Sequence, residues 1–159
     1  MIRSAFAMLL LPTVAFAGEI SIEGPMVPLA PPSAMAHAAY MTLTNSGDAT
    51  KSLIGVSADG YAMAHIHKTE IVNDVVSMAS VDLIELAPGK AVTLESGGLH
   101  IMLMKPAAAI AEGDMVSLTL EFDDGTTQNV SAMVMNMKHG HGHSGHGHGD
   151  HSAHGDHGS

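Results

Sequence analysis

Short segments of alternating apolar and polar residues, each closed by a turn signal, follow one another from residue 36 to residue 134. Alternation with a period of two lines one face of a β-strand with apolar side chains, and the frequent turns leave no long amphipathic helix. The pattern predicts an all-β sandwich or barrel of about eight or more strands. Expected strands are 37–44, 52–57, 62–71, 75–81, 91–95, 99–104, 115–122 and 126–135, with a hairpin turn at 123–125, a short strand within 18–32 and one helical turn at 107–111.

The first 17 residues have the layout of a secretory signal peptide. Arg3 supplies a positive charge, residues 5–11 an apolar stretch, and residues 15–17 (Ala-Phe-Ala) a cleavage signal. A membrane anchor is the alternative, but the apolar run is shorter than the roughly 20 residues of a spanning helix, and Pro12 interrupts it. We therefore expect export to the periplasm, cleavage after Ala17, and no membrane span in the mature chain.

The chain contains no cysteine, and its formal net charge is -10 with neutral histidines. In an exported protein the lack of cysteine excludes disulfides, thiol redox catalysis and thiolate metal sites, so stability must come from packing. The negative charge disfavours nucleic acid and anionic lipid as partners and is compatible with cations.

The composition changes abruptly near the C-terminus, which divides the mature chain into a domain at 18–136 and a tail at 137–159. From residue 139 no aliphatic side chain is larger than Ala, so we expect the tail to be disordered and to bind metal through histidine. A purification tag is the alternative, but the irregular spacing and the interleaved aspartates favour a native tail. The Irving–Williams order favours Cu(II) over Zn²⁺ and Ni²⁺ here. The tail histidines are His139, His141, His143, His146, His148, His151, His154 and His157.

Two expected strands carry histidine and methionine at alternate positions. Residues 97–104 read GGLHIMLM, and residues 63–67 read Met-x-His-x-His. Thioether sulfur is a soft donor that Mg²⁺ and Ca²⁺ avoid, and Zn²⁺ prefers imidazole, carboxylate or thiolate. A His/Met set without cysteine therefore suits Cu(I) and excludes a blue-copper centre. Neutral ligands leave the metal exchangeable, and we find no activated nucleophile or acid/base pair, so a carrier is favoured over an enzyme.

Most other methionines and the remaining histidine of the domain have an ordinary structural interpretation. Methionine in a strand usually fills the core, and a lone strand histidine such as His37 is more often structural or exposed than a ligand. Met133, Met135 and Met137 lead into His139 at every second position, which suggests a role in passing copper between tail and domain. For Met133 and Met135, that role and simple burial are equally favoured. Core positions are expected for Met26, Met35, Met41, Met115 and Met133.

The spacing of four of these residues resembles the hallmark of the PCu(A)C family of periplasmic copper chaperones, His-x10-Met-x21-His-x-Met. The positions are His67, Met78, His100 and Met102. Surrounding segments at 38–48, 76–81, 86–104 and 113–125 are also similar to the family, so the resemblance covers roughly residues 36 to 134. Where members commonly carry an acidic residue before the first motif histidine, this chain has Ile66, and it lacks tryptophan.

The resemblance implies a cupredoxin-like fold with a solvent-accessible Cu(I) site formed by the four motif residues, together with Cu(II) binding by the tail. It implies delivery of copper to the copper-A subunit of cytochrome c oxidase or to another periplasmic copper protein. His65 and Met104 share the face of the motif residues and are candidate accessory residues. A periplasmic copper, zinc or nickel buffer, or a copper-resistance store, remains the alternative.

Overall fold

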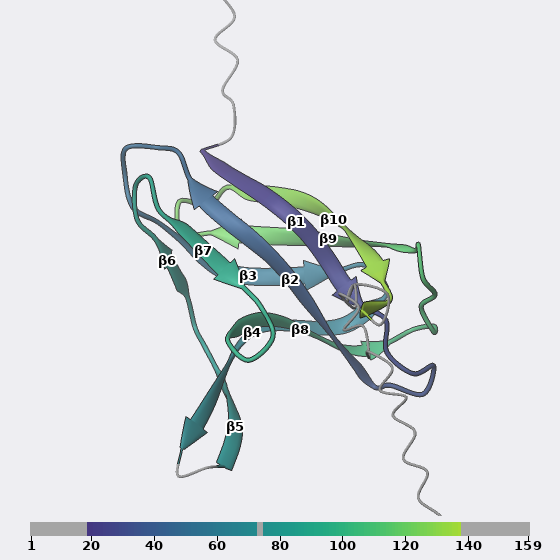
Figure 1. Ribbon diagram of the computed structural model, residues 1–159. Helices are drawn as coiled ribbons and strands as arrows, with labels where there is room; N and C mark the ends of the chain where they lie inside the picture. Colours follow the sequence, from purple (N-terminus) through teal and green to yellow (C-terminus); the bar gives the residue numbers. More distant parts are fainter. Residues whose placement is uncertain (1–18, 73–74, 138–159) are drawn as a thin grey trace, which may run out of the picture.

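The structure is a computed structural model that describes residues 19–72 and 75–137. The described part of the chain is almost entirely β-structure (Figure 1). No helix within it is long and apolar enough to cross a membrane. Its ten strands are β1 (Ile20–Pro28), β2 (Ala36–Asn45), β3 (Lys51–Ala58), β4 (Tyr61–Val72), β5 (Val75–Ser80), β6 (Ile84–Leu86), β7 (Ala91–Leu94), β8 (Leu99–Pro106), β9 (Met115–Phe122) and β10 (Thr127–Met135).

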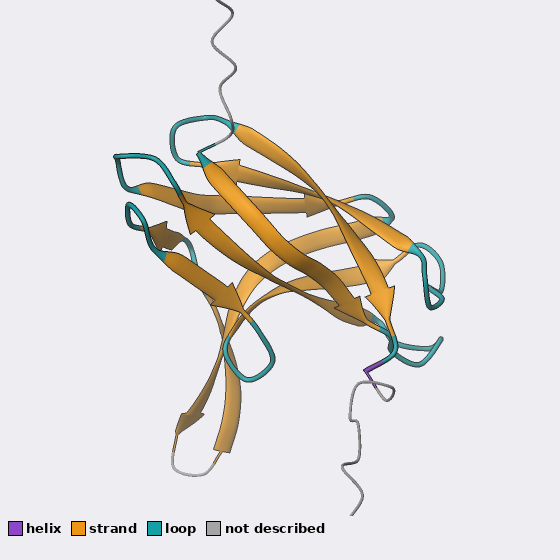
Figure 2. Ribbon diagram, turned by 45° about the horizontal axis from the view of Figure 1, so that its top comes forward, coloured by secondary structure: helices purple, strands orange, loops and turns teal. Residues whose placement is uncertain are grey.

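Strand β2 joins two parts of the fold because its two halves have different partners. Its first half pairs with β8 and its second half with β7, while β1 runs along its other edge. The strand order is β5-β4-β8-β2-β1-β10-β9-β3-β6, with β7 beside β2. Strands β4 and β5 form a long hairpin whose end projects away from the body of the domain (Figure 2).

The core is largely aliphatic and lies between the layers of strands. Leu43, Leu53, Ile101, Leu103 and Leu118 are fully buried there. Strand β2 alternates between half-buried and buried residues along its whole length, which is the period-two pattern of a strand with one face on the core. Burying a leucine or isoleucine side chain stabilises the fold by about 1.5–3 kcal/mol, so these residues fix which face of each strand points inward.

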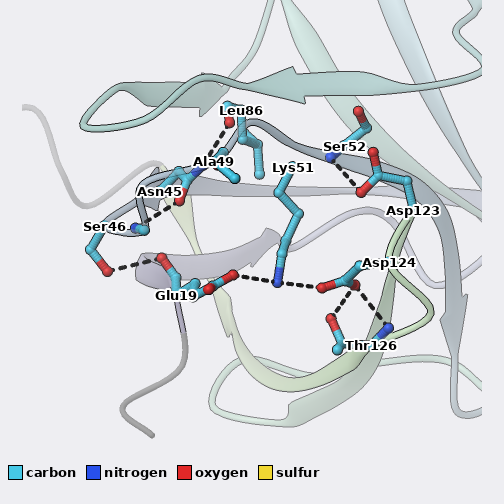
Figure 3. A network of polar contacts seen from close by, with 11 residues as sticks. Glu19, Asn45, Ser46, Ala49, Lys51, Ser52, Leu86, Asp123, Asp124 and Thr126 are labelled. Atoms are coloured by element: carbon cyan, nitrogen blue, oxygen red, sulfur yellow. Dashed lines mark hydrogen bonds and ion pairs between the residues drawn. The ribbon is translucent and has the colours of Figure 1, made fainter.

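Two polar networks lie where β1 begins and β2 ends (Figure 3). The Lys51 Nζ lies 2.9 Å from a carboxylate oxygen of Glu19 and 2.8 Å from one of Asp124, so it ties β3 to the start of β1 and to the β9–β10 turn. The fully buried Asn45 donates hydrogen bonds to the carbonyls of Ala49 and Leu86 and accepts one from the Gly47 N–H. A buried amide needs these partners, since leaving it unsatisfied would cost about 1–3 kcal/mol.

The predicted all-β fold is confirmed, and all eight strands expected between residues 36 and 135 are present with ends within two residues of prediction. The strand expected within 18–32 is β1, and the turn expected at 123–125 joins β9 to β10. Strand β6 was not predicted, because three residues are too few for periodicity to register. The helical turn expected at 107–111 was wrong, since those residues form a bend and an irregular connection. The expected signal peptide at 1–17 and residues 138–159 of the expected tail lie outside the described residues.

Candidate metal centre

The two His/Met stripes of the sequence lie on adjacent antiparallel strands and on the same face. In the register of β4 and β8, His67 is opposite His100, and His65 is opposite Met102. Directly opposed residues of an antiparallel pair share a face, with Cβ atoms about 4.5–5.5 Å apart. The intervening Ile66 and Ile101 are buried in the core. The stripes therefore form one surface on the outer side of these strands.

The imidazoles of His67 and His100 are close enough to share one metal ion. Their ring centroids are 6.0 Å apart, with an angle of 61° between the ring planes. With metal–nitrogen bonds of about 2.0–2.1 Å, two imidazoles on one ion have centroids roughly 5–6.4 Å apart. The observed separation lies within that range.

The two motif methionines flank this histidine pair. Met78 lies on β5, opposite Thr69 and diagonal to His67. Met102 lies on β8 and is diagonal to the same histidine. Diagonal neighbours in an antiparallel sheet are about 7–8 Å apart, within reach of a long side chain. The fold thus gathers all four motif residues from three strands around His67, with Met78 exposed and His100 buried.

Each of these two histidines has a ring nitrogen that no hydrogen bond within the described residues occupies. The Nδ1 of His100 lies 3.1 Å from the carbonyl oxygen of Gly98. If Nδ1 carries the proton and donates it there, the lone pair is on Nε2, which is the arrangement typical of metal-bound histidine. The Nδ1 of His67 is buried and has no hydrogen-bond partner among the described residues. A buried unpaired nitrogen is costly, and a metal ion would supply the missing partner.

The tight turn before β8 holds the Gly98 carbonyl in place. Gly97 has a φ of 81°, a conformation that favours glycine. The Gly98 carbonyl also accepts a hydrogen bond from the backbone N–H of Thr69 on β4 at 3.0 Å. This carbonyl therefore orients the His100 ring and fixes the turn against the neighbouring strand.

The electrostatic surroundings favour the neutral form of His67. Burial lowers the pKa of His67, and the neighbouring His100 and His65 lower it further. The described residues contain no group of three or more His, Asp or Glu side chains suited to a metal, so a site here depends on the thioethers. Two imidazoles and two thioethers bring no negative charge, and the thioethers are soft donors, so the set suits Cu(I).

Three further residues extend the same face beyond the motif. The rings of His65 and His67 are nearly parallel, with centroids 6.4 Å apart. Met63 and Met104 are directly opposite each other, one register step beyond the pair of His65 and Met102. The structure therefore brings both accessory candidates, His65 and Met104, to the rim of the site. Met63 completes that rim.

His37 has the structural role expected of it. It lies on the core-facing side of β2, and its Nδ1 is 2.8 Å from the hydroxyl of Tyr61. The rings meet edge to face with centroids 5.7 Å apart. Burial lowers the pKa of His37 and raises that of Tyr61.

The expectation that five methionines fill the core was wrong for four of them. Only Met41 is buried, while Met26 is half-buried and Met35, Met115 and Met133 are exposed. Met135 is exposed as well, so the burial considered for Met133 and Met135 does not occur. For Met115 and Met133 the physical reason is parity, since they occupy outward positions of β9 and β10 and the next residue of each strand, Val116 or Val134, is buried. Met35 precedes β2 and lies in a bend.

Sequence reasoning did not identify the β4–β5 hairpin as an exposed arm. Its end carries the exposed apolar side chains of Ile71, Val72, Val75 and Val76 next to Met78. The sequence shows only a run of β-branched residues here. Such a run is equally typical of a buried strand, so it does not reveal that the hairpin is exposed.

Comparison with known proteins also points to a PCuAC domain. The copper-bound PCuAC domain from PmoF2 superposes with a TM-score of 0.63 at 26% identity, covering 75% of this chain and 94% of that domain. The solution structure of the Cu(I) form of DR1885 from Deinococcus radiodurans gives a TM-score of 0.58 at 32% identity, covering 77% of this chain and 83% of that one. A putative lipoprotein of Leifsonia xyli subsp. xyli is 31% identical over 98 residues, or 61% of this chain. The match spans only 59% of that lipoprotein's length.

The fold and the His/Met face define a domain of the PCuAC type, as the resemblance in the sequence implied. The family model described as putative lipoprotein LpqE-like matches residues 20–134. The chain belongs to this LpqE-like family.

Proposed function

We propose that this chain is a periplasmic copper chaperone that carries Cu(I) on His67, Met78, His100 and Met102. The observation that carries the proposal is the His67–His100 pair, 6.0 Å apart between ring centroids, with an unpaired buried nitrogen on His67. The copper-bound PCuAC domain and the Cu(I) form of DR1885 share this fold, which supports copper as the cargo.

The arrangement is suited to carriage and transfer. The four proposed ligands are uncharged, so the bound Cu(I) keeps its positive charge. An acceptor with anionic ligands would neutralise that charge and can therefore take the ion. His100 is buried and anchors the site, whereas Met78 is exposed on the projecting hairpin. An acceptor ligand would therefore replace Met78 first, and the metal would pass outward from the arm.

The copper-A centre of cytochrome c oxidase is the proposed recipient, on the strength of the four-residue spacing. In the same proposal the histidines at 139–157 bind Cu(II) and raise the local copper concentration. No step of this role requires a catalytic residue, so we propose a binding protein rather than an enzyme.

X-ray absorption on the Cu(I)-loaded chain tests the ligand set. Two nitrogen and two sulfur neighbours are expected, and a first shell containing only nitrogen would contradict the proposal. The double variant Met78→Leu, Met102→Leu should lose both sulfur scatterers, whereas Met35→Leu, which changes an exposed methionine outside the face, should keep them.

The alternative of a copper, zinc or nickel buffer is supported by the eight tail histidines. Transfer distinguishes the two functions. A chaperone should deliver Cu(I) to an apo copper-A domain within minutes of mixing. The transfer is measured by separating the two proteins and determining the metal content of each. A buffer or resistance store should retain its copper in the same assay.

A further inference from the structure

A second group of methionines lies across three strands that contribute none of the proposed copper ligands. Met115 on β9 is directly opposite Met133 on β10, and Met133 is in parallel register with Met26 on β1. The residue that follows each methionine is a buried valine. Because successive strand residues point to opposite faces, the three methionines lie side by side on the outer surface.

These methionines interrupt an otherwise polar surface. The remaining outward positions of β9 and β10, apart from Met135, hold Ser, Thr, Asn and Glu. Met115 is 52% exposed and Met133 is 47% exposed. Single apolar residues are common on protein surfaces, but a row of three aligned on adjacent strands is a contiguous patch that packing in the domain does not explain.

The spacing of the row fits a three-coordinate soft metal ion. Neighbouring strands are about 4.7–4.9 Å apart. Three sulfur ligands at about 2.3 Å from one ion would lie roughly 4 Å from one another. Methionine has three rotatable side-chain bonds, so the outer two can lean toward the central Met133. Only a soft ion accepts three thioethers, and in a biological setting that ion is Cu(I).

The backbone under the row is firmly held. The Val134 N–H donates to the Asp114 carbonyl at 2.8 Å, and the Leu29 N–H donates to the Met135 carbonyl at 2.8 Å. These bonds fix the ends of β10 and β1 to their neighbours, which run side by side in Figure 1. On the far side of Met26, Tyr40 occupies the opposing position of β2 and borders the row.

We infer that Met26, Met115 and Met133 form a second Cu(I) site, composed of thioethers alone. Met135 and Met137, both exposed, continue from it along the chain toward the histidines at 139–157. The site would let one chain carry a second copper ion at the end of the domain where the histidine-rich segment begins. It uses different strands from the His/Met centre and stands or fails independently of that centre.

Methionine methyl NMR on the full mature chain, with Cu(I) added anaerobically, tests the inference. Addition of Cu(I) beyond the first equivalent should shift the methyl signals of Met26, Met115 and Met133 together. The His/Met centre is followed separately through Met78 and Met102. Unchanged signals of the three methionines at three equivalents of Cu(I) would overturn the second site, whatever Met78 and Met102 do.

A stoichiometry measurement with matched variants provides the second test. The double variant Met115→Leu, Met133→Leu should bind one Cu(I) fewer than the unmodified chain in competition with bicinchoninate. Its thermal unfolding should be unchanged, because both side chains are exposed and leucine is similar in size. Met35→Leu alters a methionine that is 70% exposed but outside the row. Equal copper loss in that control would show non-specific thioether binding and would overturn the site.

Discussion

Replacing Met78 by leucine separates copper binding from folding, because this methionine is a proposed ligand on an exposed arm. Its side chain is 58% exposed, and every described residue of β5 is exposed. Leucine has nearly the same volume, so the free energy of unfolding should change by less than about 0.5 kcal/mol. The substitution removes the sulfur and leaves the apolar surface of the hairpin intact.

The effect on Cu(I) affinity should be much larger. Loss of a group that merely orients a metal ligand costs about 10- to 100-fold in affinity, and loss of a ligand itself should cost at least as much. We therefore expect Kd to rise at least 10- to 100-fold, or about 1.4–2.7 kcal/mol. Anaerobic competition with bicinchoninate measures this change, and thermal unfolding of the metal-free protein measures stability.

Met63→Leu is the matched control, since Met63 lies on the same face but outside the four-residue motif. Its affinity should stay within about two-fold of the unmodified chain, a difference of roughly 0.4 kcal/mol. Unchanged affinity in Met78→Leu would refute the assignment of Met78. Equal losses in both variants would show that sulfur on this face acts collectively rather than through the motif.

Three other expectations concern the remainder of the chain. Asn45→Ala removes three side-chain hydrogen bonds, including one to the buried Leu86 carbonyl, and should lower the free energy of unfolding by about 2–4 kcal/mol in denaturant titration; an unchanged midpoint would contradict the network. The Lys51 ammonium, and then Thr126, hold the pKa of Asp124 well below its usual range. A carboxyl group whose pKa is lowered by folding stabilises the fold above its unfolded pKa of about 3.9, and this contribution is lost as the pH falls. The stability advantage of the unmodified chain over Asp124→Asn should therefore shrink between about pH 5 and 2. A pH-independent difference would be inconsistent with the Lys51–Asp124 ion pair. Deleting residues 138–159 should abolish most Cu(II) binding in calorimetry while leaving Cu(I) affinity at the His/Met centre unchanged, and full retention of Cu(II) would exclude the tail as its site.

The strands and turns could be predicted from the sequence because they depend on local chemistry. Alternation fixes which residues share a face of one strand, and turn residues mark where the strand ends. For the same reason, the order of the residues alone shows that His100 and Met102 lie on one face of their strand and Ile101 and Leu103 on the other. Strand β6 escaped prediction because three residues contain too little pattern.

The sequence by itself therefore determined the all-β class, the boundaries of eight of the ten described strands to within two residues, and the four-residue spacing that resembles the PCu(A)C motif. Only the tertiary structure decided which alternating face points inward, since parity is local but burial depends on distant strands. That is why Met115 and Met133, expected in the core, lie outside it. Cross-strand register is also a long-range property, and it alone places His67 opposite His100 and aligns Met26, Met133 and Met115 in one row.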